Sequence, residues 1–235
     1  MARTARMKDR LELDRVVLIG RTFEEYCRYL QLQESHLGSG RILDVGAGVS
    51  SFCAEASSRG YDVTAADPIY NLPVGTISAT SAKDLKYVLQ QLPSAAHKYN
   101  WTFYRDVDEL ARYRTAARYR FLEDYGARRD RYIPTALPNL PFADGEFDIV
   151  LVSHFLFLYD DFHDYEFHRQ SILELTRIVR REIRIYPLTN MSGVKSPFVE
   201  QLTGDEGCSG LTFTILKSDF EFFRNANEML RIQKG

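Results

Sequence analysis

The segment at residues 41–68 constrains the fold of this chain more than any other. It reads RILDVGAGVSSFCAEASSRGYDVTAADP, in which two short apolar runs flank a glycine turn and a stretch of small residues. Strand, glycine turn, helix and second strand in this order are typical of a βαβ unit, whose two strands lie parallel in one sheet. We therefore expect strands over 41–45 and 61–67, with a helix over 50–58 between them.

Further apolar patterns extend this unit into an α/β, Rossmann-like sheet that is mostly parallel and covered by helices. Thr22 and Glu25 predict a capping box at the start of the first helix. RNAN at 224–227 is a turn signal, which makes the last two strands an antiparallel hairpin. By periodicity we expect helices over 21–35, 81–92, 105–131 and 168–180, and strands over 148–153, 182–188, 211–223 and 228–233.

The stretch after the second strand is longer than an α/β connection needs. Residues 68–136 contain no convincing strand, so we interpret 71–136 as a helical insertion, and a candidate lid, within one domain spanning 1–235. Its long helix carries arginines interleaved with acids, which favours a salt-bridged solvent face over a cationic lid for an acidic substrate. Trp101 and its aromatic neighbours are expected to anchor the insertion rather than to hold a flat acceptor.

Composition narrows the class of protein. A formal net charge of −2 gives no reason to expect nucleic acid or an anionic membrane as a partner. No apolar run is long enough to span a bilayer, and residues 1–14 lack the apolar core of a secretory signal. The three cysteines form no metal-binding pattern and suggest free thiols. We expect a cytoplasmic protein without a structural metal, and the sequence carries no signal of its oligomeric state.

The glycine turn raises the question of its ligand. Asp44 stands two residues before the turn at 46–48, and Ser51 replaces the third glycine of the dinucleotide fingerprint. A carboxylate at Asp44 repels a pyrophosphate, which disfavours NAD, and suits the ammonium and sulfonium groups of S-adenosylmethionine. The two glycines let the backbone pass close to a ligand. Asp67, after the second strand, is placed to accept hydrogen bonds from ribose hydroxyls.

Three motifs resemble those of class I S-adenosylmethionine-dependent methyltransferases of the small-molecule "type 11" kind. They are LDVGAG, YDVTAADP and LPFADGEFDIVLVSH; the resemblance covers most of residues 37–190, and the closing hairpin fits as well. It implies a seven-stranded sheet with an antiparallel last strand. The family often has an acid near the adenine amino group. Here Ala136 stands near that place, so the backbone of Leu137 is expected to contact adenine instead.

Three further side chains are candidates for catalysis or donor binding, and each has an alternative role. His154 follows a strand and suits proton transfer, although a hydrogen-bonding role in the donor shell or the core is favoured. Arg21 is a candidate partner for the donor's carboxylate, or a solvated residue at the start of a helix. Tyr26 is a further candidate, with core packing favoured. The predicted donor-binding residues are Asp44, Gly46, Ala47, Gly48, Asp67, Pro68, Leu137, Ser153, Arg21 and Tyr26.

The segment DPIY at 67–70 is similar to a signature of methyltransferases that act on amino groups of bases or amides. It follows the wrong strand for that signature, which disfavours DNA adenine methylation, and Tyr70 is expected to line the pocket beside the adenine.

We therefore expect an enzyme that transfers the methyl group of S-adenosylmethionine to an oxygen or nitrogen of a small-molecule acceptor by in-line displacement. Two alternatives remain open on the sequence. One is methylation of a peptide or protein side chain, which an open groove under the insertion would favour. The other is a donor-binding protein without transfer activity.

Overall fold

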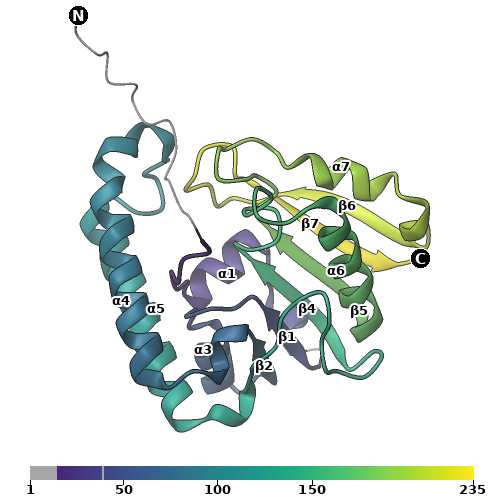
Figure 1. The fold of residues 1–235 in the computed structure, drawn as a ribbon, viewed down its shortest axis with the longest axis horizontal. Helices are drawn as coiled ribbons and strands as arrows, with labels where there is room; N and C mark the ends of the chain where they lie inside the picture. Colours follow the sequence, from purple (N-terminus) through teal and green to yellow (C-terminus); the bar gives the residue numbers. More distant parts are fainter. Residues whose placement is uncertain (1–14, 39) are drawn as a thin grey trace, which may run out of the picture.

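A seven-stranded sheet with the order β3-β2-β1-β4-β5-β7-β6 forms the centre of the computed structural model, which describes residues 15–38 and 40–235 (Figure 1). Every pair of neighbouring strands is parallel except the two that involve β7. The predicted, mostly parallel sheet with an antiparallel last strand is thus confirmed. The strands are β1 (Ile42–Val45), β2 (Val63–Ala66), β3 (Tyr132–Ile133), β4 (Phe147–Ser153), β5 (Val179–Tyr186), β6 (Leu211–Lys217) and β7 (Glu228–Lys234).

Helices cover both faces of this sheet. Ile42 and Ile149 enter a core shared with α1, α3, α4 and α5, whereas their neighbours Leu43 and Val150 enter a second core shared with α6 and α7. This alternation is what a strand buried on both faces requires. The helices are α1 (Phe23–Tyr29), α2 (Glu34–Leu37), α3 (Phe52–Ser58), α4 (Val74–Gln91), α5 (Val107–Ala127), α6 (Tyr165–Ile178) and α7 (Pro197–Thr203), with short 3-10 turns η1 (Pro68–Asn71), η2 (Leu92–Lys98), η3 (Arg129–Arg131) and η4 (Glu206–Cys208).

The first described helix begins at the predicted capping box. The Thr22 hydroxyl accepts the Glu25 N–H at 3.3 Å, and the Glu25 carboxylate accepts the Thr22 N–H at 2.8 Å. The helix ends at Tyr29, earlier than expected. The basic residues 1–14, which we considered above for a secretory signal, lie outside the described part of the chain.

In the rest of the chain, the strand predictions were wrong at two places. The stretch predicted to contain no strand includes β3, which is only two residues long and therefore shows no alternating pattern. The strand predicted over 211–223 ends at Lys217, and residues 218–227 form a longer loop in place of the four-residue turn. Phe222 and Phe223 pair with Asn100 and Tyr99 at the end of η2 instead of with β7.

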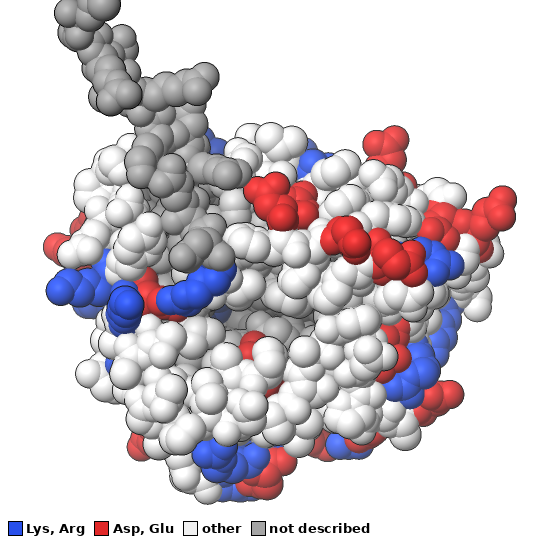
Figure 2. Space-filling model, viewed as in Figure 1, with Lys and Arg blue, Asp and Glu red and all other residues white. Residues whose placement is uncertain are grey.

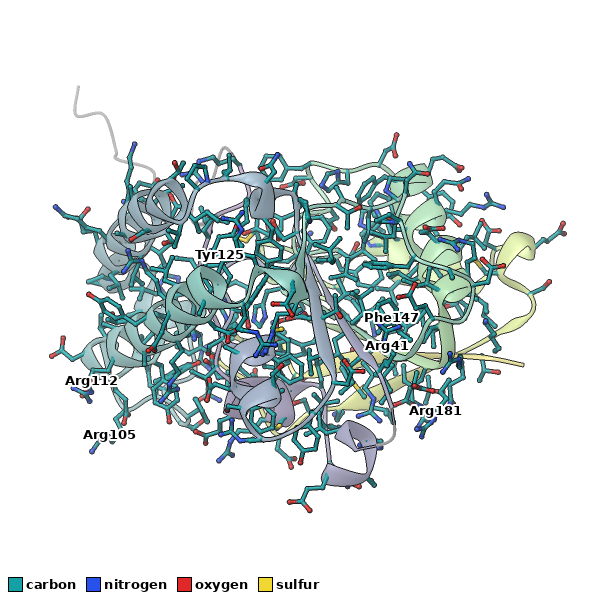
Figure 3. The ribbon with its side chains drawn as sticks, turned by 90° about the horizontal axis from the view of Figure 1, so that it is seen from below. Arg41, Arg105, Arg112, Tyr125, Phe147 and Arg181 are labelled. Atoms are coloured by element: carbon teal, nitrogen blue, oxygen red, sulfur yellow. The ribbon has the colours of Figure 1, made fainter. Side chains whose placement is uncertain are left out.

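The long connection between β2 and β3 contains α4, η2 and α5, with a non-helical stretch at 99–106. Figure 1 shows α4 and α5 side by side along one edge of the molecule. The buried apolar stripe of α5 is formed by Leu110, Ala117 and Phe121. Arg105 and Arg112 point away from the body of the protein (Figure 3), and Arg105 pairs with Glu109 at 3.0 Å. This part of α5 is therefore the salt-bridged solvent face favoured above.

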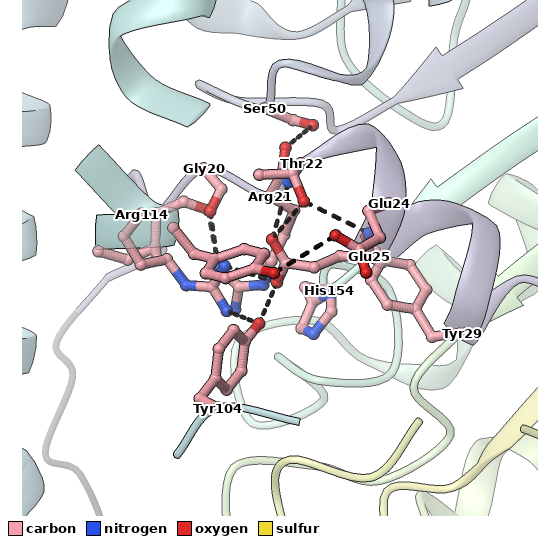
Figure 4. A network of polar contacts seen from close by, with 12 residues as sticks. Gly20, Arg21, Thr22, Glu24, Glu25, Tyr29, Ser50, Tyr104, Arg114 and His154 are labelled. Carbon is pink, nitrogen blue, oxygen red and sulfur yellow. Dashed lines mark hydrogen bonds and ion pairs between the residues drawn. The ribbon is translucent and has the colours of Figure 1, made fainter. Parts of the chain in front are cut away.

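Arg114 departs from that pattern, because it occupies a position of the apolar stripe and is only 4% exposed. Its guanidinium donates to Glu25 at 2.6 Å and to the Tyr104 hydroxyl at 2.8 Å, and Tyr104 also donates to Glu25 (Figure 4). The grouping of Arg114 with the surface arginines was therefore wrong. The buried pair joins α5 to α1 and anchors the inserted helices to the sheet.

We predict that R114M lowers the free energy of unfolding by about 3–5 kcal/mol, because it leaves the Glu25 carboxylate buried without its cation. R112M, on the exposed side of the same helix, should change it by less than about 0.5 kcal/mol. Urea denaturation followed by circular dichroism measures both. Equal unfolding midpoints for the two variants would show that the pair does not anchor α5.

Candidate functional site

The ends of three parallel strands meet at the middle of the sheet. Val45 of β1 is in register with Ala66 of β2 on one side and with Val152 of β4 on the other. The turn at 46–48 and Asp67 therefore lie next to the end of β4 at one edge. In open α/β sheets, ligands bind outside this carboxyl edge.

A cavity of about 470 Å³ lies at this edge. Figure 2 shows a hollow near the middle of this face, bordered mainly by uncharged residues. The volume falls in the range of sites for small molecules. All but one of the predicted site residues line the cavity, namely Arg21, Tyr26, Gly46, Ala47, Gly48, Asp67, Pro68, Leu137, Ser153 and His154, and Ala136 lines it beside Leu137.

Glycine is needed at the two turn positions 46 and 48 for partly different structural reasons. Both have positive φ, +66° at Gly46 and +54° at Gly48, which side chains rarely adopt. A Cβ atom at Gly46 would also meet the Phe155 ring at 3.0 Å. At Gly48 a Cβ atom would meet nothing within 4 Å, so the backbone there faces open space. A ligand in the cavity therefore has access to the backbone at Gly48.

Asp67 has both carboxylate oxygens fixed by the backbone. One oxygen accepts the Gly48 N–H at 2.9 Å and the other accepts the Ile69 N–H at 3.0 Å. Burial raises the pKa of Asp67 to about 6, and the two hydrogen bonds act in the opposite direction. Because an ionised carboxylate accepts up to about four hydrogen bonds, Asp67 retains capacity for two hydroxyl donors.

Tyr70, which we expected to line the pocket, is buried and does not line it. Its hydroxyl donates to the Gly48 carbonyl at 2.8 Å. The residue supports the glycine turn from behind and is not available to a ligand.

Asp44 is the predicted donor-binding residue that does not line the cavity. It is fully buried, and one oxygen accepts the hydroxyl of Tyr26, which does line the cavity, at 3.2 Å. The other oxygen has no partner among the described residues. Burial raises the pKa of Asp44 well above its ordinary value, the Tyr26 hydrogen bond opposes this rise, and the nearby Asp67 charge adds to it. A buried oxygen left without a partner needs an explanation, and a cationic ligand group near the turn would supply one.

His154 directly follows β4 and has a positive φ of +52°, which is uncommon for a residue with a side chain. Its Nδ1 lies 3.0 Å from the Ser153 hydroxyl, which lies 2.7 Å from the Tyr29 hydroxyl. No partner for Nε2 occurs in residues 15–38 and 40–235. Burial, followed by the charges of Arg21 and Arg114, lowers the pKa of His154 well below 6.5. The imidazole is therefore neutral at pH 7.

Arg21 brings a cation into the same cavity. Its carbonyl accepts the Ser50 hydroxyl and the Ser51 N–H, each at 2.9 Å, which fixes its backbone against the glycine turn. Its guanidinium donates to the carbonyls of Ile19 and Gly20 at 3.1 and 3.2 Å and forms no ion pair within the described part of the chain (Figure 4). Arg21 is thus a partly buried cation held only by backbone oxygens.

Sequence reasoning missed most of an aromatic wall of the cavity, although Tyr99 is among the aromatic neighbours of Trp101 that were weighed for a flat acceptor and assigned to anchoring instead. Tyr99, Phe220, Phe222 and Phe223 line the cavity, and Tyr99 stacks on Phe222 with ring centroids 4.7 Å apart. The run FEFF at 220–223 was a signal, but its apolar character was interpreted as a strand. Within the described residues, no cluster of His, Cys, Asp or Glu is suited to a metal ion, and every helix is too short or too polar to cross a bilayer.

Comparisons with known proteins were made for the whole chain. No family model matches it. The uncharacterized protein MJ0045 of Methanocaldococcus jannaschii is 42% identical over 225 residues, which cover 95% of this chain and 99% of that protein.

Solved structures show more distant likenesses. The magnesium protoporphyrin IX methyltransferase of Synechocystis with bound SAM has a TM-score of 0.41 at 12% identity, over 83% of this chain and 70% of that chain. A SAM-dependent methyltransferase of Thermotoga maritima, described as a possible histamine N-methyltransferase, has a TM-score of 0.43 at 13% identity, over 90% and 94%. At these values neither likeness says what this chain binds.

We predict that the imidazole of His154 titrates well below pH 6.5, because burial and two nearby guanidinium groups oppose its protonation. In R21M the titration midpoint should rise, since one of these cations is removed. The pH dependence of the histidine ring signals in NMR spectra measures both. A midpoint at or above 6.5 in the wild-type protein would contradict this description of the site.

Proposed function

We propose that this chain, which belongs to the same family as the uncharacterized protein MJ0045, is an S-adenosylmethionine-dependent methyltransferase acting on a small molecule. The observation that carries this proposal is an open glycine turn beside the backbone-fixed carboxylate of Asp67, both in the lining of one cavity. Asp44, which has an orphaned carboxylate oxygen, is linked to that lining through its hydrogen bond with Tyr26.

The residues present fit this donor. Asp67 would accept hydrogen bonds from the two ribose hydroxyls, with the open backbone at Gly48 beside them. The side chain of Pro68 and the backbone of Leu137 would contact the adenine. The unpartnered oxygen of Asp44 favours a ligand with a cationic group at the turn. The pyrophosphate of a dinucleotide would offer no cationic group to this oxygen.

When bound, S-adenosylmethionine supplies a methyl group on a cationic sulfur, which takes the bonding electron pair and leaves as a neutral thioether. The acceptor's lone pair forms the new bond to carbon, and an acceptor that is a hydroxyl or amine must lose one proton. His154 is neutral and lines the cavity, so its free Nε2 would receive that proton. The apolar walls exclude water and hold the two reactants in line.

Cavity size and construction support a small-molecule acceptor over a peptide. The space of about 470 Å³ is walled by segments from distant parts of the chain, including Val16–Ile19, α4 and the loop around Phe222. A peptide site needs an extended groove that accepts backbone on both sides of the reacting side chain. The role of the helices at 71–136 as a closing lid stays a prediction.

We predict that D67N weakens binding of S-adenosylhomocysteine by roughly ten- to hundred-fold, which corresponds to about 1.5–3 kcal/mol for hydrogen bonds to a charged group. Wild-type affinity should rise as pH increases through about 6, because ionised Asp67 accepts the ribose hydroxyls better than the protonated form. D67N should lack that pH step. The exposed variant D108N is the matched control, and titration calorimetry measures all three proteins. Unchanged affinity in D67N would contradict the assignment of the donor site.

We predict that H154A slows turnover by about 10²- to 10⁴-fold, the usual contribution of a general base. Donor affinity should change by no more than about three-fold. Release of S-adenosylhomocysteine, measured with the best acceptor from a panel of phenols, carboxylic acids and amines, gives the rate, and the exposed variant H97A is the control. A parallel loss of donor affinity and rate would identify His154 as a donor ligand instead of a base.

A further inference from the structure

We infer that Arg21 binds an anionic group on the acceptor, and that the acceptors are small aromatic acids. This inference rests on the proposed function, because it names the second ligand of the same cavity. It assigns Arg21 to the acceptor and not to the carboxylate of the donor. The observations that support it are the unpaired charge of Arg21, its place in the cavity, the aromatic wall and the balance of charges around it.

The guanidinium of Arg21 lacks an anion in the described residues. An arginine keeps its proton in proteins, so a desolvated guanidinium is costly unless an anion pairs with it. Glu25 is the nearby carboxylate, but one of its oxygens already accepts Arg114 and Tyr104 and the other accepts the N–H and hydroxyl of Thr22. Because only one nitrogen of Arg21 is engaged, the remaining N–H groups are open to a carboxylate of a ligand.

Arg21 lies near His154 in the lining of the cavity (Figure 4). Its charge acts to lower the pKa of His154, Tyr99 and Tyr186. Burial raises the pKa of both Asp44 and Asp67, and hydrogen bonds oppose the rise in each. The charge of Asp67 adds to the rise at Asp44, and Arg21 contributes to neither. Since Coulomb interactions weaken with distance, Arg21 faces the space next to His154.

Rings line the part of the cavity next to this cation. Tyr99 and Phe222 stack, Phe223 meets Tyr99 at 5.5 Å, and Phe220 meets Tyr186 at 6.3 Å. Leucine and valine side chains of α4 complete this wall. Faces and edges of rings favour a flat, apolar ligand. An apolar pocket with one well-placed polar group gives such a ligand a single orientation.

The charges that line the cavity also favour an acid as the second ligand. Besides Asp67, the charged lining consists of Arg21, Lys98 and Arg114, and Glu25 balances one of these cations from behind the wall. A cationic donor adds to the positive charge. An anionic acceptor would neutralise part of this excess, and its carboxylate would lie beside the neutral base His154.

The test compares 2-naphthoate with its neutral analogue 2-naphthamide, using titration calorimetry on the protein with and without S-adenosylhomocysteine. The wild-type protein should prefer naphthoate by at least ten-fold. R21M should lose this preference, keep its affinity for naphthamide, and bind S-adenosylhomocysteine within about three-fold of wild type. The exposed variant R112M should behave as wild type. R21K keeps the positive charge but lacks the paired N–H donors of a guanidinium, so it should retain a reduced preference for naphthoate over naphthamide. This variant replaces R21M in the test if R21M does not fold.

Two outcomes would overturn the inference. Equal affinity of the wild-type protein for naphthoate and naphthamide would show that the cavity does not select acids. A ten-fold or greater loss of S-adenosylhomocysteine affinity in R21M, with the naphthoate preference intact, would assign Arg21 to the donor. A wild-type protein that binds naphthoate through Arg21 but does not bind S-adenosylhomocysteine would overturn the proposed function and leave the anion site standing.

Discussion

The buried contact between Arg114, Glu25 and Tyr104 is the interaction on which the rest of the molecule depends. It is the place where the helices inserted between β2 and β3 are joined by charge to the first helix and so to the sheet. The same helices supply part of the cavity wall, and the residue before the capping box is Arg21. A contact that fixes the insertion therefore also fixes one side of the site and leaves Arg21 without its nearest possible counter-ion.

The cavity that results separates charges of opposite sign. At the strand ends, the two buried acids Asp44 and Asp67 lie behind and beside an open glycine turn. In the same cavity, Arg21 lies near a neutral histidine, and rings form part of the lining. In the proposed reaction, a donor with cationic groups binds near Asp44 and Asp67, and an acidic acceptor binds near Arg21. Each ligand thus brings a charge opposite to that of the buried side chains beside it.

The local patterns in the sequence were sufficient for much of this structure. The βαβ unit, the capping box at Thr22 and the antiparallel last strand follow from short-range chemistry, and the register of parallel strands then brings the glycine turn and Asp67 together. Arg114 was misplaced because charged neighbours surround it in the sequence, although it falls four residues after Leu110 and three before Ala117, on the buried stripe. Tyr70 and the run FEFF were misread for a different reason. Their positions depend on contacts with Gly48 and with Tyr99 that no local pattern encodes.

The most direct test of the central claim is a calorimetric titration of the wild-type protein with S-adenosylhomocysteine and, separately, with NAD at pH 7.5. The account predicts binding of S-adenosylhomocysteine at one site per chain and no binding of NAD, because a pyrophosphate would approach the carboxylate of Asp44. Binding of NAD without binding of S-adenosylhomocysteine would contradict this reading of the glycine turn and of both buried acids.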